Sequence, residues 1–281
     1  MTAGRGALLL AVLLAGACER LPQALLEGRG PSPSEERDSE IGRTFERAVV
    51  LLPRGHGAAP FEASMDSDAL RNALANTQVR YPTILYLHGC AGMGDLAPLR
   101  QLAGRGFAII APDSFARRFR PLQCRPGREQ GGENIFVYDF RLAEVSYALH
   151  RLGALPWIDA NRLFLMGTSE GGLATALYRG DEFAARVIAQ WTCQGAPYVR
   201  GLAAPREEPV LAIVRADDPW YDPARTEGQR GDCGAFMADR PNSQSLLLPG
   251  SRHNVFDDPT VVGRIAEFLT MAGLPPHGRK R

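Results

Sequence analysis

A serine bracketed by glycines is the first group in this sequence that could do chemistry. Residues 165–172 are Leu-Met-Gly-Thr-Ser-Glu-Gly-Gly, which places Ser169 in a Gly-x-Ser-x-Gly pattern. This pattern is typical of a nucleophile elbow, a strained turn between a buried strand and a helix. Side chains two residues before and after the serine would collide in that turn, which explains Gly167 and Gly171. We therefore predict that Ser169 is a nucleophile.

A nucleophilic serine needs a base to take its proton. Of the five histidines, only His253 follows the last predicted strand, at 245–248, and precedes the final predicted helix. We expect His253 to accept the proton of Ser169 and to pass it to the leaving group.

The imidazole in turn needs an acid to orient it. Asp217 and Asp218 both follow the apolar run 210–214, and either could serve. We favour Asp218, which stands directly before Pro219 in a turn, and keep Asp217 as the alternative.

Two backbone amides are predicted to form an oxyanion hole. The run His88-Gly89-Cys90-Ala91-Gly92 follows another apolar segment, so the Cys90 N–H could join the Glu170 N–H in stabilising a negatively charged oxygen. We interpret His88 as structural. For the Cys90 side chain we expect a disulfide or a small filler beside the amides.

Four further residues are candidates for substrate contacts. An arginine-rich insertion lies between Phe115 and Ile135, where Arg117 and Arg118 could pair with a carboxylate or another anion. The alternative for this insertion is a solvated loop pinned by Cys124. Trp220 and Tyr221, next to the acid, could line a pocket or belong to the core.

Short apolar runs alternate with helical periodicity along the chain, which predicts the elements that position these groups. Helices are expected over 137–153, from Glu170, and over 261–271, with Phe140, Leu142, Val145, Ala148, Leu149 and Leu152 on the buried face of the first. The alternation indicates an α/β fold with a mostly parallel, doubly wound sheet and helices on both faces. Reactive groups then gather beyond the carboxyl ends of the strands. The predicted strands are 48–52, 83–87, 107–111, 163–166, 187–189, 210–214 and 245–248.

The N-terminus has the composition of an export signal. Residues 1–18 carry an early arginine, an apolar core and then small residues, which predicts a signal peptide. Its end resembles a lipobox with Cys18 as the lipidated residue, and plain cleavage after Ala17 is the alternative. We expect a flexible tether over 19–42, the catalytic domain over 43–275 and a disordered basic tail over 276–281. The expected location is the bacterial periplasm, or the outer membrane for a lipoprotein.

The predicted export bears on the redox state of the remaining cysteines. Export leaves Cys90, Cys124, Cys193 and Cys233, an even number that permits three pairings in a disulfide-forming compartment. Four buried thiols are the alternative. Metal binding is disfavoured, because no cysteines have C-x-x-C spacing and no histidine pair accompanies them.

The composition of the chain limits the classes of partner that we expect. A net charge of +1 gives no indication of a nucleic-acid partner. We expect a small-molecule ester as substrate, no cofactor, and membrane contact only through a lipid anchor.

With these positions assigned, the chain resembles the α/β-hydrolase superfamily and, within it, the dienelactone hydrolase family. The resemblance implies metal-free hydrolysis of an ester or lactone through an acyl-enzyme intermediate. It departs at the elbow, where dienelactone hydrolases have cysteine and this chain has Ser169, so a serine esterase is expected. The resemblance spans about residues 80–273 and is carried by Leu87-His88-Gly89, residues 111–115, the elbow, Asp218-Pro219 and Gly250-x-x-His253.

Two other functions are compatible with the sequence. A serine peptidase of the prolyl oligopeptidase type shares the Gly-x-Ser-x-Gly-Gly elbow, although such enzymes usually carry a propeller or large cap that this chain has no room for. A catalytically silent, lipid-anchored binding protein is the non-enzymatic alternative, and a broken triad would be its signature.

Overall fold

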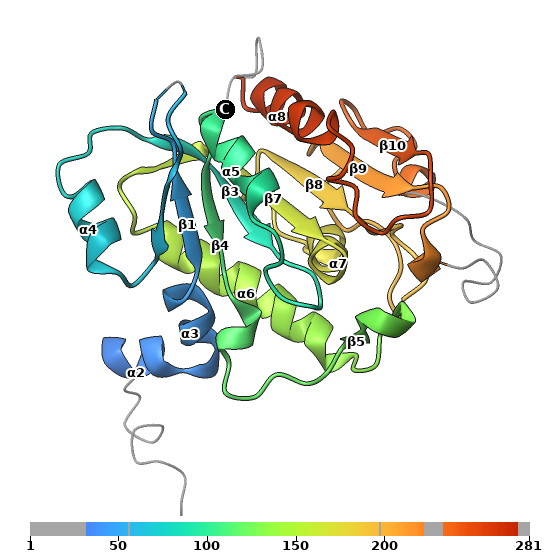
Figure 1. Cartoon of the computed structure of the whole chain (residues 1–281), viewed down its shortest axis with the longest axis horizontal. Helices are drawn as coiled ribbons and strands as arrows, with labels where there is room; N and C mark the ends of the chain where they lie inside the picture. The colour runs from blue at the N-terminus through green and yellow to red at the C-terminus, as the bar shows by residue number, and fades with distance from the viewer. Residues whose placement is uncertain (1–31, 56, 197, 222–232, 275–281) are drawn as a thin grey trace, which may run out of the picture. The chain divides into compact units, whose positions relative to one another are not determined.

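An eight-stranded sheet in the order β10-β9-β8-β7-β3-β4-β1-β2 organises the main body of the protein (Figure 1). The strands from β10 to β4 are parallel, and β1 runs antiparallel to both β4 and β2. Their bounds are β1 Val49–Leu52, β2 Phe61–Ser64, β3 Tyr81–Leu87, β4 Ala108–Ala111, β7 Ile158–Thr168, β8 Ala185–Ala189, β9 Val210–Arg215 and β10 Gln244–Leu248. Every strand predicted from the sequence is present. The additional strand β2 lies at the sheet edge and has a weak apolar pattern, which hid it in the sequence.

The computed structural model describes residues 32–55, 57–196, 198–221 and 233–274. The predicted signal peptide, Cys18 and the basic tail lie outside this range. Among the described helices, none combines the length and the apolar character needed to cross a bilayer.

Helices cover both faces of the sheet, as expected of a doubly wound fold (Figure 1). Helices α5 (Ala97–Gly104) and α8 (Val261–Ala272) pack on one face, where Ile84 and Tyr86 of β3 point. Helices α3 (Glu40–Glu46), α6 (Phe136–Leu152) and α7 (Glu170–Leu177) pack on the other, where the alternate residues Leu85 and Leu87 point. Because the central strand β3 is buried on both faces, its inner residues Ile84–Leu87 are all aliphatic or aromatic.

The helix predicted at 137–153 is α6, but its buried face differs from the predicted one. Val145, Ala148 and Leu152 are buried as expected, whereas Phe140, Leu142 and Leu149 are only half-buried. The other buried residues of α6 are two charged side chains, Arg141 and Glu144, together with Val137 and Tyr138. An apolar periodicity cannot reveal a buried charge pair.

The predicted tether over 19–42 contains helical structure at its C-terminal end. In the short unit 32–39, helix α2 (Pro33–Asp38) begins with a capping box between Ser32 and Glu35. Helix α3 belongs to the main body, where Phe45 is buried in the core. Residues 33–38 and 40–42 are therefore helical within the predicted tether, because a Ser-Pro-rich composition concealed a well-capped helix start.

The remaining short elements lie outside the central sheet. They are helix α4 (Asp68–Leu74), the 3₁₀ turns Ser114–Ala116, Pro126–Arg128, Pro219–Tyr221 and Cys233–Phe236, and the two-stranded ribbon of β5 (Cys124–Arg125) and β6 (Gln130–Gly131).

Candidate active site

Ser169 lies at the junction of β7 and α7 in strained backbone geometry. Its φ of 53° and ψ of −115° fall in a region that L-residues rarely adopt. Two hydrogen bonds fix this turn: the Ser169 N–H donates to the Ala189 carbonyl at 2.9 Å, and the Ser169 carbonyl accepts from the Leu173 N–H at 2.9 Å. This is the strand-turn-helix context that the Gly-x-Ser-x-Gly pattern predicts.

The elbow glycines are required by close backbone contacts. A Cβ added to Gly167 would lie 2.1 Å from the Gly171 carbonyl oxygen. A Cβ added to Gly171 would lie 2.0 Å from the Leu87 carbonyl oxygen at the end of β3. These glycines therefore let the serine turn pack directly against the neighbouring strand.

His253 and Asp218 are hydrogen-bonded to each other. The His253 Nδ1 lies 2.7 Å from the Asp218 Oδ2, and the Asp218 side chain is 1% exposed. The other carboxylate oxygen, Oδ1, accepts the Trp220 N–H at 3.1 Å. Because Nδ1 faces a carboxylate it carries the proton, so Nε2 is left as the acceptor. The His253 Nε2 is buried and has no hydrogen-bond partner among the described residues.

Asp217, the alternative acid, occupies a different position. Its side chain is exposed, and its backbone N–H donates to the Gly250 carbonyl at 3.2 Å. The histidine contact therefore belongs to Asp218, the residue favoured from the sequence.

All three predicted triad positions lie at one edge of the sheet. Ser169 follows β7, Asp218 follows β9 and His253 follows β10, and these strands are parallel. The loop after β3 joins them, since a Cβ on Gly89 would lie 3.5 Å from the Ser169 Cβ. The carboxyl ends of parallel strands thus gather residues that are far apart in the sequence.

Two aromatic side chains surround the His253 imidazole. Trp220 stacks on it with a centroid distance of 5.0 Å and an interplanar angle of 28°. Tyr221 lies 6.0 Å from it and donates its hydroxyl to the Gln190 carbonyl at 2.5 Å. Burial, together with the negative charge of Asp218, raises the pKa of Tyr221 well above its ordinary value, so its hydroxyl stays protonated. Trp220 therefore packs on the histidine, whereas Tyr221 lies between His253 and the core residue Trp191, whose ring centroid is 5.7 Å away.

Replacing Trp220 tests this packing. Trp220→Ala should lower kcat by up to about tenfold, because a stacked aromatic pair contributes about 0.5–1.5 kcal/mol and the imidazole would lose that support. Trp220→Phe retains a flat ring and should stay within about threefold of wild type. Steady-state kinetics of both variants measure the effect, and equal rates for Trp220→Ala and wild type would contradict it.

The two predicted oxyanion donors flank the serine. Glu170 is the first residue of α7, whose N-terminus favours negative charge, and Cys90 lies in the loop after β3. Within the described residues, neither backbone N–H has an intramolecular acceptor. Both N–H groups are therefore available to a substrate oxygen.

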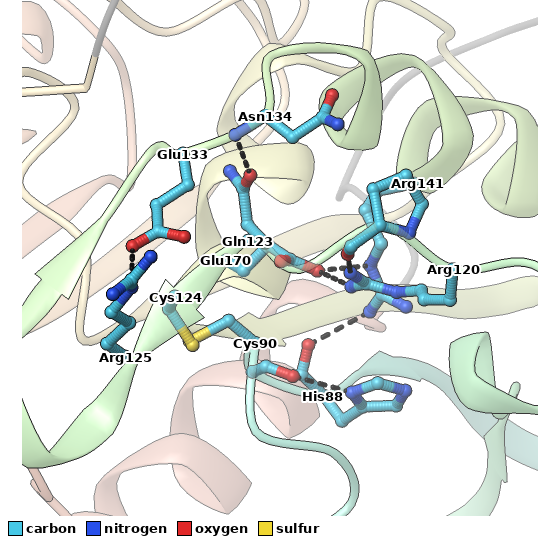
Figure 2. Close-up of a disulfide and its surroundings, with 12 residues drawn as sticks. His88, Cys90, Arg120, Gln123, Cys124, Arg125, Glu133, Asn134, Arg141 and Glu170 are labelled. Atoms are coloured by element: carbon cyan, nitrogen blue, oxygen red, sulfur yellow. Dashed lines mark hydrogen bonds and ion pairs between the residues drawn. A yellow bond between two sulfur atoms is a disulfide. The ribbon is translucent and has the colours of Figure 1, made fainter.

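His88 is a structural residue, as predicted (Figure 2). It is fully buried; its Nδ1 donates to the Gly89 carbonyl at 2.7 Å, and its Nε2 accepts the Ser114 N–H at 3.0 Å. Burial lowers the pKa of His88 well below its ordinary value of 6.5, and the Arg141 guanidinium lowers it further. The neutral ring thus ties the β3 loop to the turn after β4.

The buried neutral state of His88 gives stability a defined pH dependence. Below pH 6.5 the unfolded chain protonates His88 while the folded chain does not, so the free energy of unfolding falls as pH falls. The slope of this contribution is at most about 1.4 kcal/mol per pH unit, the value for one proton bound only by the unfolded chain. In His88→Gln, which cannot titrate, that part of the slope should disappear. Urea unfolding at pH 5, 6 and 7 compares the two proteins, and identical slopes would contradict the assignment.

A buried ionic cluster lies behind the elbow, and the sequence did not reveal it (Figure 2). Arg141 pairs with Glu144 at 2.7 Å and donates to the His88 carbonyl at 2.9 Å. Arg120 pairs with the Glu170 carboxylate at 2.5 Å, and this contact is almost fully buried. The one feature of the sequence that could have indicated this cluster is the spacing of Arg141 and Glu144, three residues apart on the core face of α6. The partner Arg120 comes from a distant loop that no local pattern connects to them.

The arginines predicted to contact substrate occupy other positions. The Arg117 side chain is 6% exposed, pairs with Glu144 at 3.1 Å and lies 4.9 Å over the Phe140 ring. The Arg117 guanidinium therefore makes its contacts inside the protein, although the sequence placed it among the candidates for substrate contacts. Arg118 is exposed.

The cysteines form two disulfides, as expected of an even number in an oxidising compartment. The pairs are Cys90–Cys124 and Cys193–Cys233, which selects one of the three pairings. A thiol nucleophile at Cys90 is thereby excluded. Among the described residues, no group of three or more His, Cys, Asp or Glu side chains is arranged to hold a metal ion.

Comparison with known proteins agrees with this architecture. Neither family models nor curated proteins match the chain. Among solved structures, a dienelactone hydrolase-like promiscuous phosphotriesterase from metagenomic libraries is 17% identical with a TM-score of 0.50, over 80% of this chain and 99% of that one. An esterase from the hyperthermophilic archaeon Pyrobaculum calidifontis is 14% identical with a TM-score of 0.49, over 90% and 98%. With the parallel sheet and the elbow, the first of these similarities shows that the chain has the predicted α/β-hydrolase fold.

Proposed function

We propose that this protein is a serine hydrolase that cleaves a carboxylic ester or lactone. The supporting observation is the hydrogen bond between buried Asp218 and His253, formed at the sheet edge where the strained Ser169 also lies. An acid, a base and an activated hydroxyl in this order are what acyl transfer requires. The fold alone would not support this choice, because one fold hosts many functions.

The residues define each step of the proposed reaction. His253 Nε2 takes the proton of the Ser169 hydroxyl while Oγ attacks the substrate carbonyl carbon, and Asp218 stabilises the resulting imidazolium. The N–H groups of Cys90 and Glu170 donate to the oxygen that becomes negative. His253 then protonates the leaving alcohol, which yields the acyl-enzyme. A water molecule then loses a proton to His253 and attacks the acyl carbon. The bond between that carbon and Ser169 Oγ breaks, His253 returns the proton to Oγ, and the acid leaves.

A fluorophosphonate tests the nucleophile directly. The purified protein should gain one adduct, located on Ser169 by peptide mass, and His253→Ala should abolish it. Ser251→Ala is a matched control, because this exposed serine lies close to His253 in the sequence, and its variant should label normally. A folded protein that does not label would favour the silent binding protein. Turnover of peptide anilides with none of p-nitrophenyl esters would favour a peptidase.

We further infer that the protein works outside the reducing cytoplasm. Disulfides persist in oxidising compartments, and this chain has two. The predicted signal peptide and lipidation at Cys18 agree with export. The mass of the mature N-terminus after expression in a bacterial host separates lipidation from plain cleavage.

A further inference from the structure

The segment between the 3₁₀ turn Ser114–Ala116 and helix α6 is joined to the loop after β3 by the Cys90–Cys124 disulfide. We call residues 117–134 the strap. Its centre is the ribbon of β5 and β6, in which Cys124 faces Gly131 and Arg125 faces Gln130. Gln123 closes the ribbon, because its side-chain oxygen accepts the Asn134 N–H at 2.9 Å (Figure 2).

The first attachment of the strap is covalent. The disulfide joins Cys124, in the strap, to Cys90, whose backbone N–H is a proposed oxyanion donor (Figure 2). The loop around Cys90 contains Gly92 and Gly94, both with positive φ, and a Gly92 N–H to Gly89 carbonyl contact of 3.1 Å. Glycine allows such a loop many backbone conformations, so a covalent link to the ribbon restricts it strongly.

The second attachment is ionic. Arg120, also in the strap, pairs with the carboxylate of Glu170 at 2.5 Å, and its Nε donates to the Ser114 hydroxyl at 3.1 Å. The side chains of Arg120 and Glu170 are 4% and 3% exposed, so the pair is weakly screened by solvent. Glu170 is also the residue whose N–H is the second proposed oxyanion donor. The strap thus reaches both donors by independent contacts.

We propose that the strap positions the oxyanion hole, with the Cys90–Cys124 disulfide fixing one N–H donor and Arg120 fixing the other. This inference rests on the serine hydrolase function proposed above. Cys124 and Arg120 touch no reacting atom in this scheme; they are positioning residues that act through Cys90 and Glu170. Because oxyanion donors act on charge that develops only in the transition state, loosening the strap lowers kcat and leaves KM nearly unchanged.

Selective reduction tests the covalent attachment without any mutation. A dithiol reductant attacks the disulfide, forms a mixed disulfide and then closes on itself, so that Cys90 and Cys124 each gain an electron and a proton. Cys90 is partly exposed, whereas Cys193 and Cys233 are both completely buried. Mild reduction followed by alkylation and peptide mass should therefore modify the first pair and spare the second, which serves as the internal control.

The expected result of reduction is a fall in kcat of roughly tenfold or more, since losing one oxyanion donor altogether costs about 10²–10³-fold. Affinity for a trifluoromethyl ketone, which forms a tetrahedral adduct, should fall in parallel, and KM should change less than twofold. Reoxidation should restore both values. A merely structural disulfide would change the unfolding midpoint without this split between kcat and KM.

Arg120→Gln tests the ionic attachment in the same way, with Arg120→Lys as a second variant that keeps the charge. We expect kcat to fall about tenfold in Arg120→Gln. The matched control is Arg125→Gln, because Arg125 lies on the same strap and pairs with Glu133 at 2.6 Å on the exposed side. Arg125→Gln should leave kcat within twofold.

The outcomes separate this inference from the function on which it rests. If the oxidised wild-type protein shows no turnover that depends on Ser169, the proposed function fails and the strap role fails with it. If the oxidised protein is active, but kcat and ketone affinity survive verified reduction of Cys90–Cys124 and Arg120→Gln matches Arg125→Gln, only the strap role is overturned.

Discussion

Asp218→Asn should lower kcat by about 10⁴-fold, the loss typical of this substitution in Ser-His-Asp triads. The structural cause is the 2.7 Å contact between the carboxylate and His253 Nδ1. An amide at position 218 could present its NH₂ group to Nδ1, which would move the imidazole proton to Nε2. The histidine could then no longer accept a proton from Ser169. Because asparagine has nearly the shape of aspartate, the fold should be retained.

Asp217→Asn is the matched control for this prediction. The two aspartates are adjacent, but Asp217 is exposed and contacts the Gly250 carbonyl only through its backbone N–H. The kcat of Asp217→Asn should stay within twofold of the wild-type value. Steady-state kinetics on the best ester found by screening, with urea unfolding to verify the fold, measure both variants. Similar losses in both, or a larger loss in Asp217→Asn, would show that the contact with His253 does not carry the activity.

The candidate triad could be predicted from the sequence because a parallel sheet converts chain order into spatial proximity. Ser169, Asp218 and His253 each follow an apolar run, and these runs became β7, β9 and β10. All parallel strands end at the same edge of the sheet. Once the strands are assigned, the residues just beyond them are therefore expected to lie close together. The sequence favoured Asp218 over Asp217, and the structure shows that Asp218 is the one in contact with His253.

The buried charges behind the elbow could not be predicted in this way. Arg141 and Glu144 lie on the core face of α6, where the sequence rules expect apolar side chains. Their burial is tolerated only because Arg117, Ser114 and the His88 carbonyl satisfy them from other elements. Those partners come from segments 20 or more residues away, and only the folded chain brings them together. The disulfide pairing was hidden for the same reason.

The glycine at position 171 connects the candidate site to the fold. Gly171 is needed because the serine turn packs against the end of β3, and Gly167 is needed because it packs against Gly171. The loop that follows β3 also contacts the serine, through Gly89. The serine turn and the loop after β3 therefore meet at the end of the central strand. Separating the two strands at this point should damage both stability and activity.

Gly171→Ala should accordingly destabilise the protein by about 4 kcal/mol or more, a large part of the 5–15 kcal/mol that stabilises a typical native protein. The added Cβ would lie 2.0 Å from the Leu87 carbonyl oxygen and 2.8 Å from that of His88. Both obstacles are backbone atoms at the end of the central strand, so no side-chain rotation can relieve the collision. Little folded protein should be recovered, and what remains should unfold at much lower urea.

Gly263→Ala, at a second helical glycine, should have the opposite effect on stability. Gly263 lies inside α8, and a Cβ there would meet no heavy atom within 4 Å. Alanine is preferred over glycine in a helix by about 0.5–1 kcal/mol, so this variant should be slightly more stable than wild type. Urea unfolding of the two variants beside wild type measures the contrast. If Gly171→Ala were as stable as Gly263→Ala, the close packing of the elbow on β3 would be refuted, because only that packing distinguishes the two positions.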